Sequence, residues 1–124
     1  MGVVLKLHVA LGISSGDVAA FVGAGGKSGA ILAVSGGLTQ EGMRVLVAPT
    51  TKMLSSEADM IGPLVTSEDA DDLRAKTERA FSEAPAVVVG SGMISKNRVG
   101  GVDPEWVGDL AGLADVALDR KSVV

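Results

Sequence analysis

The stretch Val18-Ala19-Ala20-Phe21-Val22-Gly23-Ala24-Gly25-Gly26-Lys27-Ser28 decides the fold of this chain. Its first part, residues 18–22, is a short and continuous apolar run, which is typical of a parallel strand buried on both faces. Glycine-rich residues 23–26 follow at once, and the apolar positions between Ala30 and Leu38 then favour a helix. The sequence therefore predicts a strand, a tight glycine loop and a helix in direct succession.

The glycine loop has the parts that phosphate binding requires. A loop that wraps phosphates points several backbone N–H groups at one centre, and glycine permits both the close approach and positive φ angles. The following helix adds further N–H groups and the positive end of its dipole. Lys27 is expected to neutralise phosphate oxygens, and the Ser28 hydroxyl is expected to ligate Mg²⁺. We therefore predict a binding site for ATP or GTP that consists of Gly23, Ala24, Gly25, Gly26, Lys27 and Ser28.

The loop is a compressed form of the standard G-x-x-x-x-G-K-[ST] pattern. Phe21 stands where that pattern has its first Gly, so the loop reads G-x-G-G-K-S. The dinucleotide-binding pattern G-x-G-x-x-G fits less well, because it needs a Gly where Ser28 stands and an acidic residue after the second strand. The alternative to a ligand site is a glycine-rich turn with a solvated Lys.

The rest of the chain predicts an α/β fold. Apolar runs without strict alternation occupy residues 18–22, 43–48, 86–90 and 114–118. Helices are expected between them, including one over 66–81 that begins at Thr66 or Ser67 and one that begins at Asp103-Pro104. Residues 54–65 are expected to be mostly loop, with a short extended piece at residues 61–65. Buried strands separated by segments of helical length indicate a parallel sheet with helices on both faces.

Polar residues follow two of the predicted strands. Thr50, Thr51 and Lys52 come after Pro49, at the strand end where open α/β sheets bind ligands. The hydroxyls are candidates to contact a magnesium-bound water or the γ-phosphate, and Lys52 is a candidate to add positive charge. From the residues alone, a Ser/Thr turn with an exposed Lys is an equal alternative. Gly90-Ser91-Gly92 either lines the same cleft or only turns the chain.

The composition excludes several partners and chemistries. A net charge of −4, with no basic stripe and 2% aromatic residues, argues against nucleic-acid binding. The chain has no Cys, so a disulfide, a thiolate metal site and a Cys nucleophile are excluded, and a cytoplasmic setting is expected. The most apolar run, residues 18–38, is interrupted by Lys27 and several glycines, so no membrane span is expected.

Two segments carry a resemblance to a known family. They are residues 16–28, which contain the glycine loop, and residues 45–53, Val-Leu-Val-Ala-Pro-Thr-Thr-Lys-Met. With them the chain resembles the YqeC family, accessory proteins of selenium-dependent molybdenum hydroxylases that are also described as selenium cofactor biosynthesis proteins. The resemblance spans residues 5–118. It implies a P-loop NTPase-like fold, a role in maturing such an enzyme, and partners that are the hydroxylase or its cofactor-assembly proteins.

The end of the sequence departs from the family's pattern. Family members continue the fourth strand into Glu-Ala-Asp-Gly, whereas here we expect the strand to break at Leu118. Residues 119–124 match one reading frame of a sequencing adapter. We therefore expect residues 1–118 to be the N-terminal part of a nucleotide-binding domain and residues 119–124 to be a non-native tail. The strand-end carboxylate that organises magnesium and water is then expected to be missing, which favours binding without turnover.

Three functions stay open at this point. The first is an NTPase or nucleotide-dependent switch for cofactor assembly, in which Lys27 is the candidate catalytic residue and Ser28 holds Mg²⁺ near the γ-phosphate. The second is a non-hydrolysing module that binds a nucleotide or another anionic cofactor. The third is a small-molecule kinase, which needs an acceptor site in addition.

Overall fold

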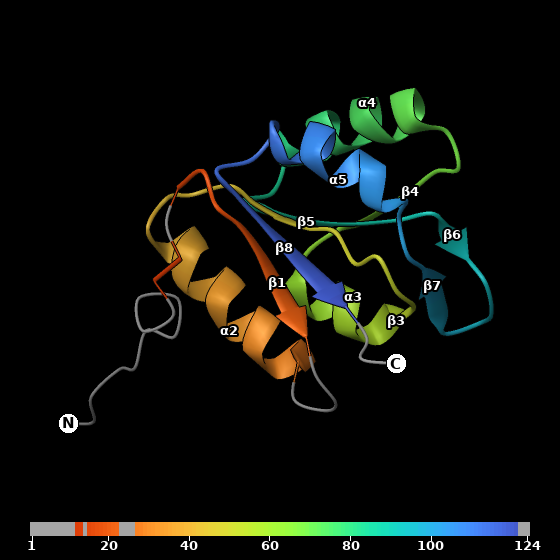
Figure 1. The fold of residues 1–124 in the computed structure, drawn as a ribbon, viewed down its shortest axis with the longest axis horizontal. Coiled ribbons are helices and arrows are strands. Elements are labelled where there is room, and N and C mark those ends of the chain that lie inside the picture. The colour runs from red at the N-terminus through yellow and green to blue at the C-terminus, as the bar shows by residue number, and fades with distance from the viewer. Residues whose placement is uncertain (1–11, 14, 23–26, 122–124) are drawn as a thin grey trace.

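A five-stranded sheet lies at the centre of the structure, a computed structural model that describes residues 12, 13, 15–22 and 27–121 (Figure 1). Side chains are described for all of these except residues 20–22, 27, 28, 120 and 121. The elements are β1 (Val18–Val22), α2 (Lys27–Gln40), β2 (Val45–Val47), β3 (Met53–Leu54), α3 (Ser55–Ile61), β4 (Leu64–Thr66), α4 (Ala70–Phe81), β5 (Ala86–Gly90), β6 (Gly92–Met93), β7 (Arg98–Gly100), α5 (Pro104–Ala111) and β8 (Val116–Lys121).

The strands of the central sheet are all parallel and follow the order β1-β8-β2-β5-β4. In the middle of the sheet, Val47 of β2 pairs with Leu118 of β8 on one side and with Val88 of β5 on the other. Every residue of β2 and β5 is buried. This is the environment that continuous apolar runs predict, so the expected parallel α/β sheet is confirmed.

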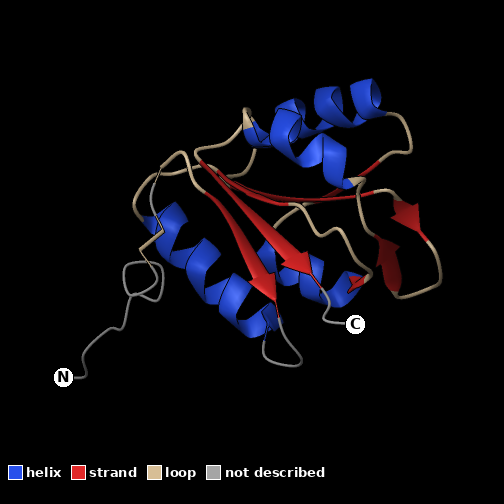
Figure 2. Ribbon diagram, viewed as in Figure 1, coloured by secondary structure: helices blue, strands red, loops and turns tan. Residues whose placement is uncertain are grey.

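Helices cover both faces of this sheet, as predicted. The chain steps from β1 to β2 and then to β4 through α2 and α3, and it returns to β5 and β8 through α4 and α5. Connections between parallel strands are almost always right-handed. A helix that leads to a strand on one side of its starting strand therefore lies on the opposite face of the sheet from a helix that leads to a strand on the other side. Figure 2 shows α2 and α3 on one face and α4 and α5 on the other.

Each face has its own hydrophobic core, because successive strand residues point to opposite sides. Val45 and Val47 of β2 pack with Ile31 of α2 in one cluster. Leu46, between them in the sequence, packs with Leu73 of α4 in the other cluster. The two clusters together fix the register of the central strands.

Helix α2 runs directly from the glycine loop and is 14 residues long. It continues without a break through Gly36-Gly37, although two glycines lower its intrinsic stability. Ile31, Val34 and Leu38 are fully buried against the sheet, and this packing compensates for the weak propensity. Among the described helices, none is long and apolar enough to cross a lipid bilayer.

The start of helix α4 corrects a prediction. The helix begins at Ala70, and Asp69 caps it by accepting a hydrogen bond from the Asp72 N–H at 3.0 Å. The predicted starts at Thr66 and Ser67 are wrong, because Thr66 belongs to β4 and the Ser67 hydroxyl accepts from the Asp69 N–H before the helix. The predicted start of α5 at Asp103-Pro104 is confirmed, with Asp103 accepting from the Glu105 N–H.

The segment 54–65, predicted as mostly loop, contains helix α3, which was not predicted. The extended piece predicted at residues 61–65 is confirmed in part, because β4 begins at Leu64. Helix α3 has seven residues, no side-chain cap, and one buried residue, Ala58, so it carries too little periodicity to be recognised. A second, antiparallel sheet of order β3-β7-β6 was also not predicted. Its strands are two or three residues long, and their pairing depends on tertiary contacts rather than on local sequence.

Strand β8 does not break at Leu118. It continues to Lys121, which pairs with Val22 of β1, and it lies between β1 and β2 with a parallel neighbour on each side. The prediction of a break is wrong because this ladder stabilises the strand beyond its apolar part. The non-native origin of residues 119–124 stays a prediction that only the nucleotide sequence tests, and a native origin of Asp119 is part of the function proposed below.

Candidate functional site

The order of strand, loop and helix around the glycine loop agrees with the prediction. Strand β1 ends at Val22 and α2 begins at Lys27, so the loop joins a parallel strand to a helix N-terminus. Lys27 and Ser28 are the first two residues of α2, and nothing is described of their side chains. The predicted ligand residues Gly23, Ala24, Gly25 and Gly26 lie outside the described residues.

The strand next to β1 carries a buried carboxylate at its carboxyl end. Asp119 of β8 is 4% exposed and lies level with Ala20 of β1. Thr50, which follows β2, donates two hydrogen bonds to Asp119 Oδ1, one from its backbone N–H and one from its hydroxyl, each 3.1 Å long. The Thr50 hydroxyl also lies 3.4 Å from Oδ2. Asp119 and Thr50 therefore join the carboxyl ends of two neighbouring strands.

This pair corrects the expectation that a strand-end carboxylate is missing. Burying a carboxylate costs several kcal/mol (order of magnitude) unless hydrogen bonds and nearby charges compensate for the lost hydration. Asp119 was overlooked because the residues after Leu118 were assigned to a tail. The available signal was an acidic residue directly after the apolar run 114–118, on a strand that reaches the predicted ligand edge.

The three polar residues predicted after β2 have different environments. Thr50 contacts Asp119, Thr51 is half-buried beside it, and Lys52 is exposed. Thr50 is thus more than a turn residue, because both of its hydrogen-bond donors reach the carboxylate. Lys52 lies exposed to solvent at the same edge of the sheet.

The segment Gly90-Ser91-Gly92 turns the chain from β5 into the antiparallel sheet β3-β7-β6, the small sheet. Gly90 is the last residue of β5 and Gly92 is the first of β6. The Ser91 N–H donates to the Gly100 carbonyl at 3.0 Å, which fixes this turn against β7. Of the two alternatives for this segment, the described contacts favour the turn.

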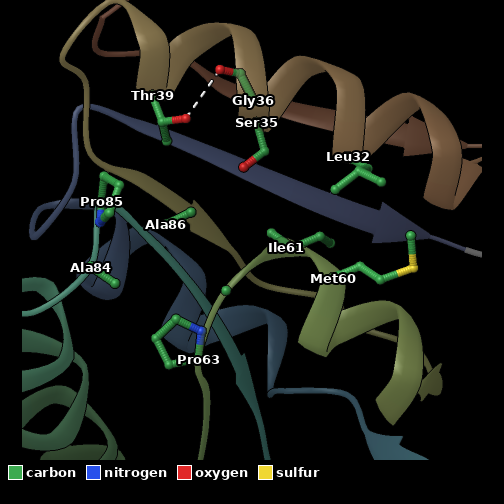
Figure 3. Close-up of a pocket in the computed structure, with 11 residues that line it drawn as sticks. Leu32, Ser35, Gly36, Thr39, Met60, Ile61, Pro63, Ala84, Pro85 and Ala86 are labelled. Carbon is green, nitrogen blue, oxygen red and sulfur yellow. Dashed lines mark hydrogen bonds between the residues drawn. The ribbon is translucent and has the colours of Figure 1, made fainter.

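A groove of about 190 Å³ lies at the opposite edge of the sheet, between α2, the end of α3 and the start of β5 (Figure 3). Its lining includes Leu32, Ile61 and Pro85 and contains no charged residue. Figure 3 shows that the Thr39 hydroxyl turns to the Gly36 carbonyl of its own helix, to which it donates at 3.1 Å. A phosphate needs N–H groups or cations, so we place the candidate site at the carboxyl edge rather than in this groove.

The comparison with protein families agrees with the described fold. The sequence model of the YqeC protein family matches residues 19–119, which is more than half of the chain. The chain belongs to the YqeC family. The matched range includes both Thr50 and Asp119, so the buried pair of this YqeC-family chain lies within the family's region. No curated protein and no solved structure matches the chain.

Proposed function

We propose that this YqeC-family protein binds and hydrolyses a nucleoside triphosphate, ATP or GTP, together with Mg²⁺ at the carboxyl edge of its sheet. In the proposal this activity assists the maturation of a selenium-dependent molybdenum hydroxylase through contacts with that enzyme or its cofactor-assembly proteins. The observation that carries the proposal is the buried Asp119 carboxylate, held by Thr50, on the strand beside β1 and its glycine loop.

The glycine loop and α2 supply the attraction for phosphate. Gly23, Ala24, Gly25 and Gly26 offer backbone N–H groups, and the N-terminus of a 14-residue helix adds its partial positive charge. Lys27, at the first position of that helix, neutralises negative charge on the terminal phosphates. This charge is the main contribution to phosphoryl transfer, because the transition state spreads negative charge over the phosphate oxygens.

The residues at this edge fit a magnesium ion. Mg²⁺ prefers oxygen ligands and keeps several waters, and Ser28, Asp119 and Thr50 offer hydroxyl and carboxylate oxygens. Ser28 and Asp119 would hold the ion, which when bound neutralises phosphate oxygens. Thr50 holds the Asp119 carboxylate in place by donating two hydrogen bonds to it. Asp119 also removes the reason for expecting binding without turnover.

In the proposal the selenium chemistry takes place on a partner or on a part of the protein outside these 124 residues. A perselenide carrier needs a Cys, and none of these 124 residues is Cys. In the proposal the nucleotide state therefore controls how this protein contacts the partner that carries selenium or the molybdenum cofactor.

The test is isothermal titration of the protein with Mg-ATP and Mg-GTP, for the wild type and for Lys27→Ala. The matched control is Lys96→Ala, which removes an exposed Lys from the segment between β6 and β7. We expect one nucleotide to bind the wild type and the control equally and Lys27→Ala at least about tenfold more weakly, because the charge-assisted contact to phosphate is lost. Equal affinity of wild type and Lys27→Ala would reject the proposed site.

Turnover is measured separately as release of phosphate in the presence of Mg²⁺. Release that depends on Lys27 supports the NTPase. Tight binding without release points to the non-hydrolysing module, and a phosphorylated product that appears only with an added acceptor points to a kinase.

A further inference from the structure

The segment between β2 and α3 contains Thr50, Thr51 and Lys52, and the small sheet holds it at both ends. At the start, the Val102 N–H donates to the Pro49 carbonyl at 2.9 Å. At the end, the Ser55 N–H donates to the Asn97 carbonyl, also at 2.9 Å. Between these contacts β3 pairs with β7, with Met53 opposite Val99. The short range 97–102 thus fixes the whole segment 49–55.

Gly101 makes the closest approach to this segment. A Cβ atom on Gly101 would lie 2.4 Å from the Thr50 carbonyl carbon and 2.6 Å from the Thr51 nitrogen. Both are backbone atoms, and real Cβ contacts essentially never fall below 3.0 Å, whereas ordinary contact begins at 3.4 Å. A side chain at position 101 therefore has to move the Thr50–Thr51 peptide by about 1 Å, a displacement large enough to disturb hydrogen bonds of 3.1 Å.

The small sheet lies where the connections that leave two neighbouring strands of the central sheet diverge. The chain leaves β2 towards α3 on one face of the sheet and leaves β5 towards α5 on the other, and β2 and β5 are neighbours. In open α/β sheets such a divergence at the carboxyl ends of the strands creates a ligand crevice. Here β3, from the β2 side, pairs with β7, from the β5 side, and Figure 1 shows β6 and β7 beyond the end of β5. The position of Thr50 is therefore set by residues that follow β5.

We infer that the small sheet positions the Thr50–Lys52 segment for the nucleotide, and that Gly101 is the positioning residue; this inference rests on the proposed function. Gly101 itself contacts no phosphate. It allows the Thr50–Thr51 peptide to sit where the Thr50 N–H and hydroxyl both reach Asp119.

The test compares Gly101→Ala with two matched glycine variants. Gly62→Ala introduces an equally severe clash, with a Cβ 2.1 Å from the Ala86 carbonyl oxygen, at the opposite edge of the sheet. Gly108→Ala places a Cβ in open space on α5. For each variant the affinity for Mg-ATP and Mg-GTP is measured by isothermal titration below its melting temperature, which is measured alongside.

We expect Gly101→Ala to bind at least about tenfold more weakly than the wild type, since a displacement of about 1 Å is able to cost up to about a hundredfold. Gly108→Ala should bind within about twofold of the wild type, the usual result for a surface change without lost contacts. Gly62→Ala should melt at a lower temperature but, while folded, bind as tightly as the wild type. Wild-type affinity in Gly101→Ala overturns the inference, and so does an equal loss in Gly62→Ala.

A measurement on the wild type covers the case in which Gly101→Ala does not fold. The Val102 and Ser55 amides make the hydrogen bonds that join range 97–102 to segment 49–55. Both amides should exchange with solvent more slowly when Mg-nucleotide is bound, since the ligand stabilises the conformation in which these hydrogen bonds are formed. Unchanged exchange at both amides overturns the inference while leaving nucleotide binding intact. No binding by the wild type rejects the proposed function itself.

Discussion

Asp119 Oδ1 accepts hydrogen bonds from both the backbone N–H and the hydroxyl of Thr50, each at 3.1 Å. The two residues lie 69 positions apart in the sequence, and their contact joins the ends of β8 and β2. The carboxylate is almost completely removed from solvent, so these hydrogen bonds help to compensate for its lost hydration. The same pair therefore stabilises the sheet edge and defines the candidate site.

Asp119→Asn should separate these two roles. The Asn side chain keeps one oxygen that is able to accept from Thr50, so we expect the free energy of unfolding to change by about 1 kcal/mol or less. It loses the negative charge that would hold Mg²⁺, so the enhancement of nucleotide binding by magnesium should fall at least about tenfold. Titrations with and without Mg²⁺ measure this. The control is Asp115→Asn, which changes a carboxylate that accepts a hydrogen bond from the Arg44 N–H before β2. An unaltered magnesium dependence in Asp119→Asn contradicts the assignment of Asp119 as a magnesium ligand.

Thr50→Val should weaken the contact between Thr50 and Asp119 by removing a hydrogen-bond donor. Valine has nearly the same shape as threonine but no hydroxyl, so Asp119 loses one of the two donors that Thr50 supplies. We expect a loss of about 1–3 kcal/mol in unfolding free energy by urea titration, the usual cost of removing a hydrogen bond to a buried charged group. Thr50→Ser keeps the hydroxyl and should retain most of the stability. If Thr50→Val is as stable as the wild type, the hydroxyl contributes nothing to the pair.

Gly36→Ala should stabilise the protein. Gly36 is an exposed residue inside α2, and a Cβ there meets no atom within 4 Å. Alanine in a helix interior is favoured over glycine by about 0.5–1 kcal/mol, so the melting temperature should rise. Gly42→Ala is the contrasting variant, because Gly42 has φ +84° and a side chain there is strained by about 1–2 kcal/mol. A lower melting temperature for Gly36→Ala means that the open surface of α2 tolerates no side chain.

Within the described part of the chain, the Asp72 carboxyl is a local source of pH-dependent stability. The hydrogen bond from the Lys76 ammonium, followed by one with Ser67, holds the pKa of Asp72 below its ordinary value of 3.8. Since the folded-state pKa is lowered, this contribution is present above about pH 3.8 and is lost as the pH falls through the lower folded value. An NMR titration of the Asp72 carboxyl should show this, and Lys76→Met should move its pKa back towards 3.8. An unchanged Asp72 titration in Lys76→Met assigns the shift to Ser67 instead.

The sequence allowed the central sheet to be predicted where burial determines local composition. The run 86–90 is continuous and apolar because β5 is covered on both faces, and the glycine-rich sequence marks the passage from β1 to α2. Thr50 was found by its place after a parallel strand. These features depend on local sequence and on the general rule that open α/β sheets bind ligands at the carboxyl ends of their strands.

The remaining features depend on contacts between distant segments. The strands of the small sheet are too short to show a period, and nothing local distinguishes Gly101, which packs on a backbone, from Gly108, which faces open space. Asp119 was missed because the residues after Leu118 were assigned to a tail, and its contact with Thr50 joins segments that are distant in sequence. Position in the folded sheet, rather than residue type, gives these residues their roles.

Amide chemical-shift mapping with Mg-ATP and Mg-GTP tests the central claim most directly. If the nucleotide binds at the carboxyl edge, the shifts of Ser28 in the first turn of α2, of Thr50 and of Asp119 should change on saturation, while those of Gly62 and Ala86 at the opposite edge stay constant. No shift at the first three residues, or changes confined to Gly62 and Ala86, would contradict the account.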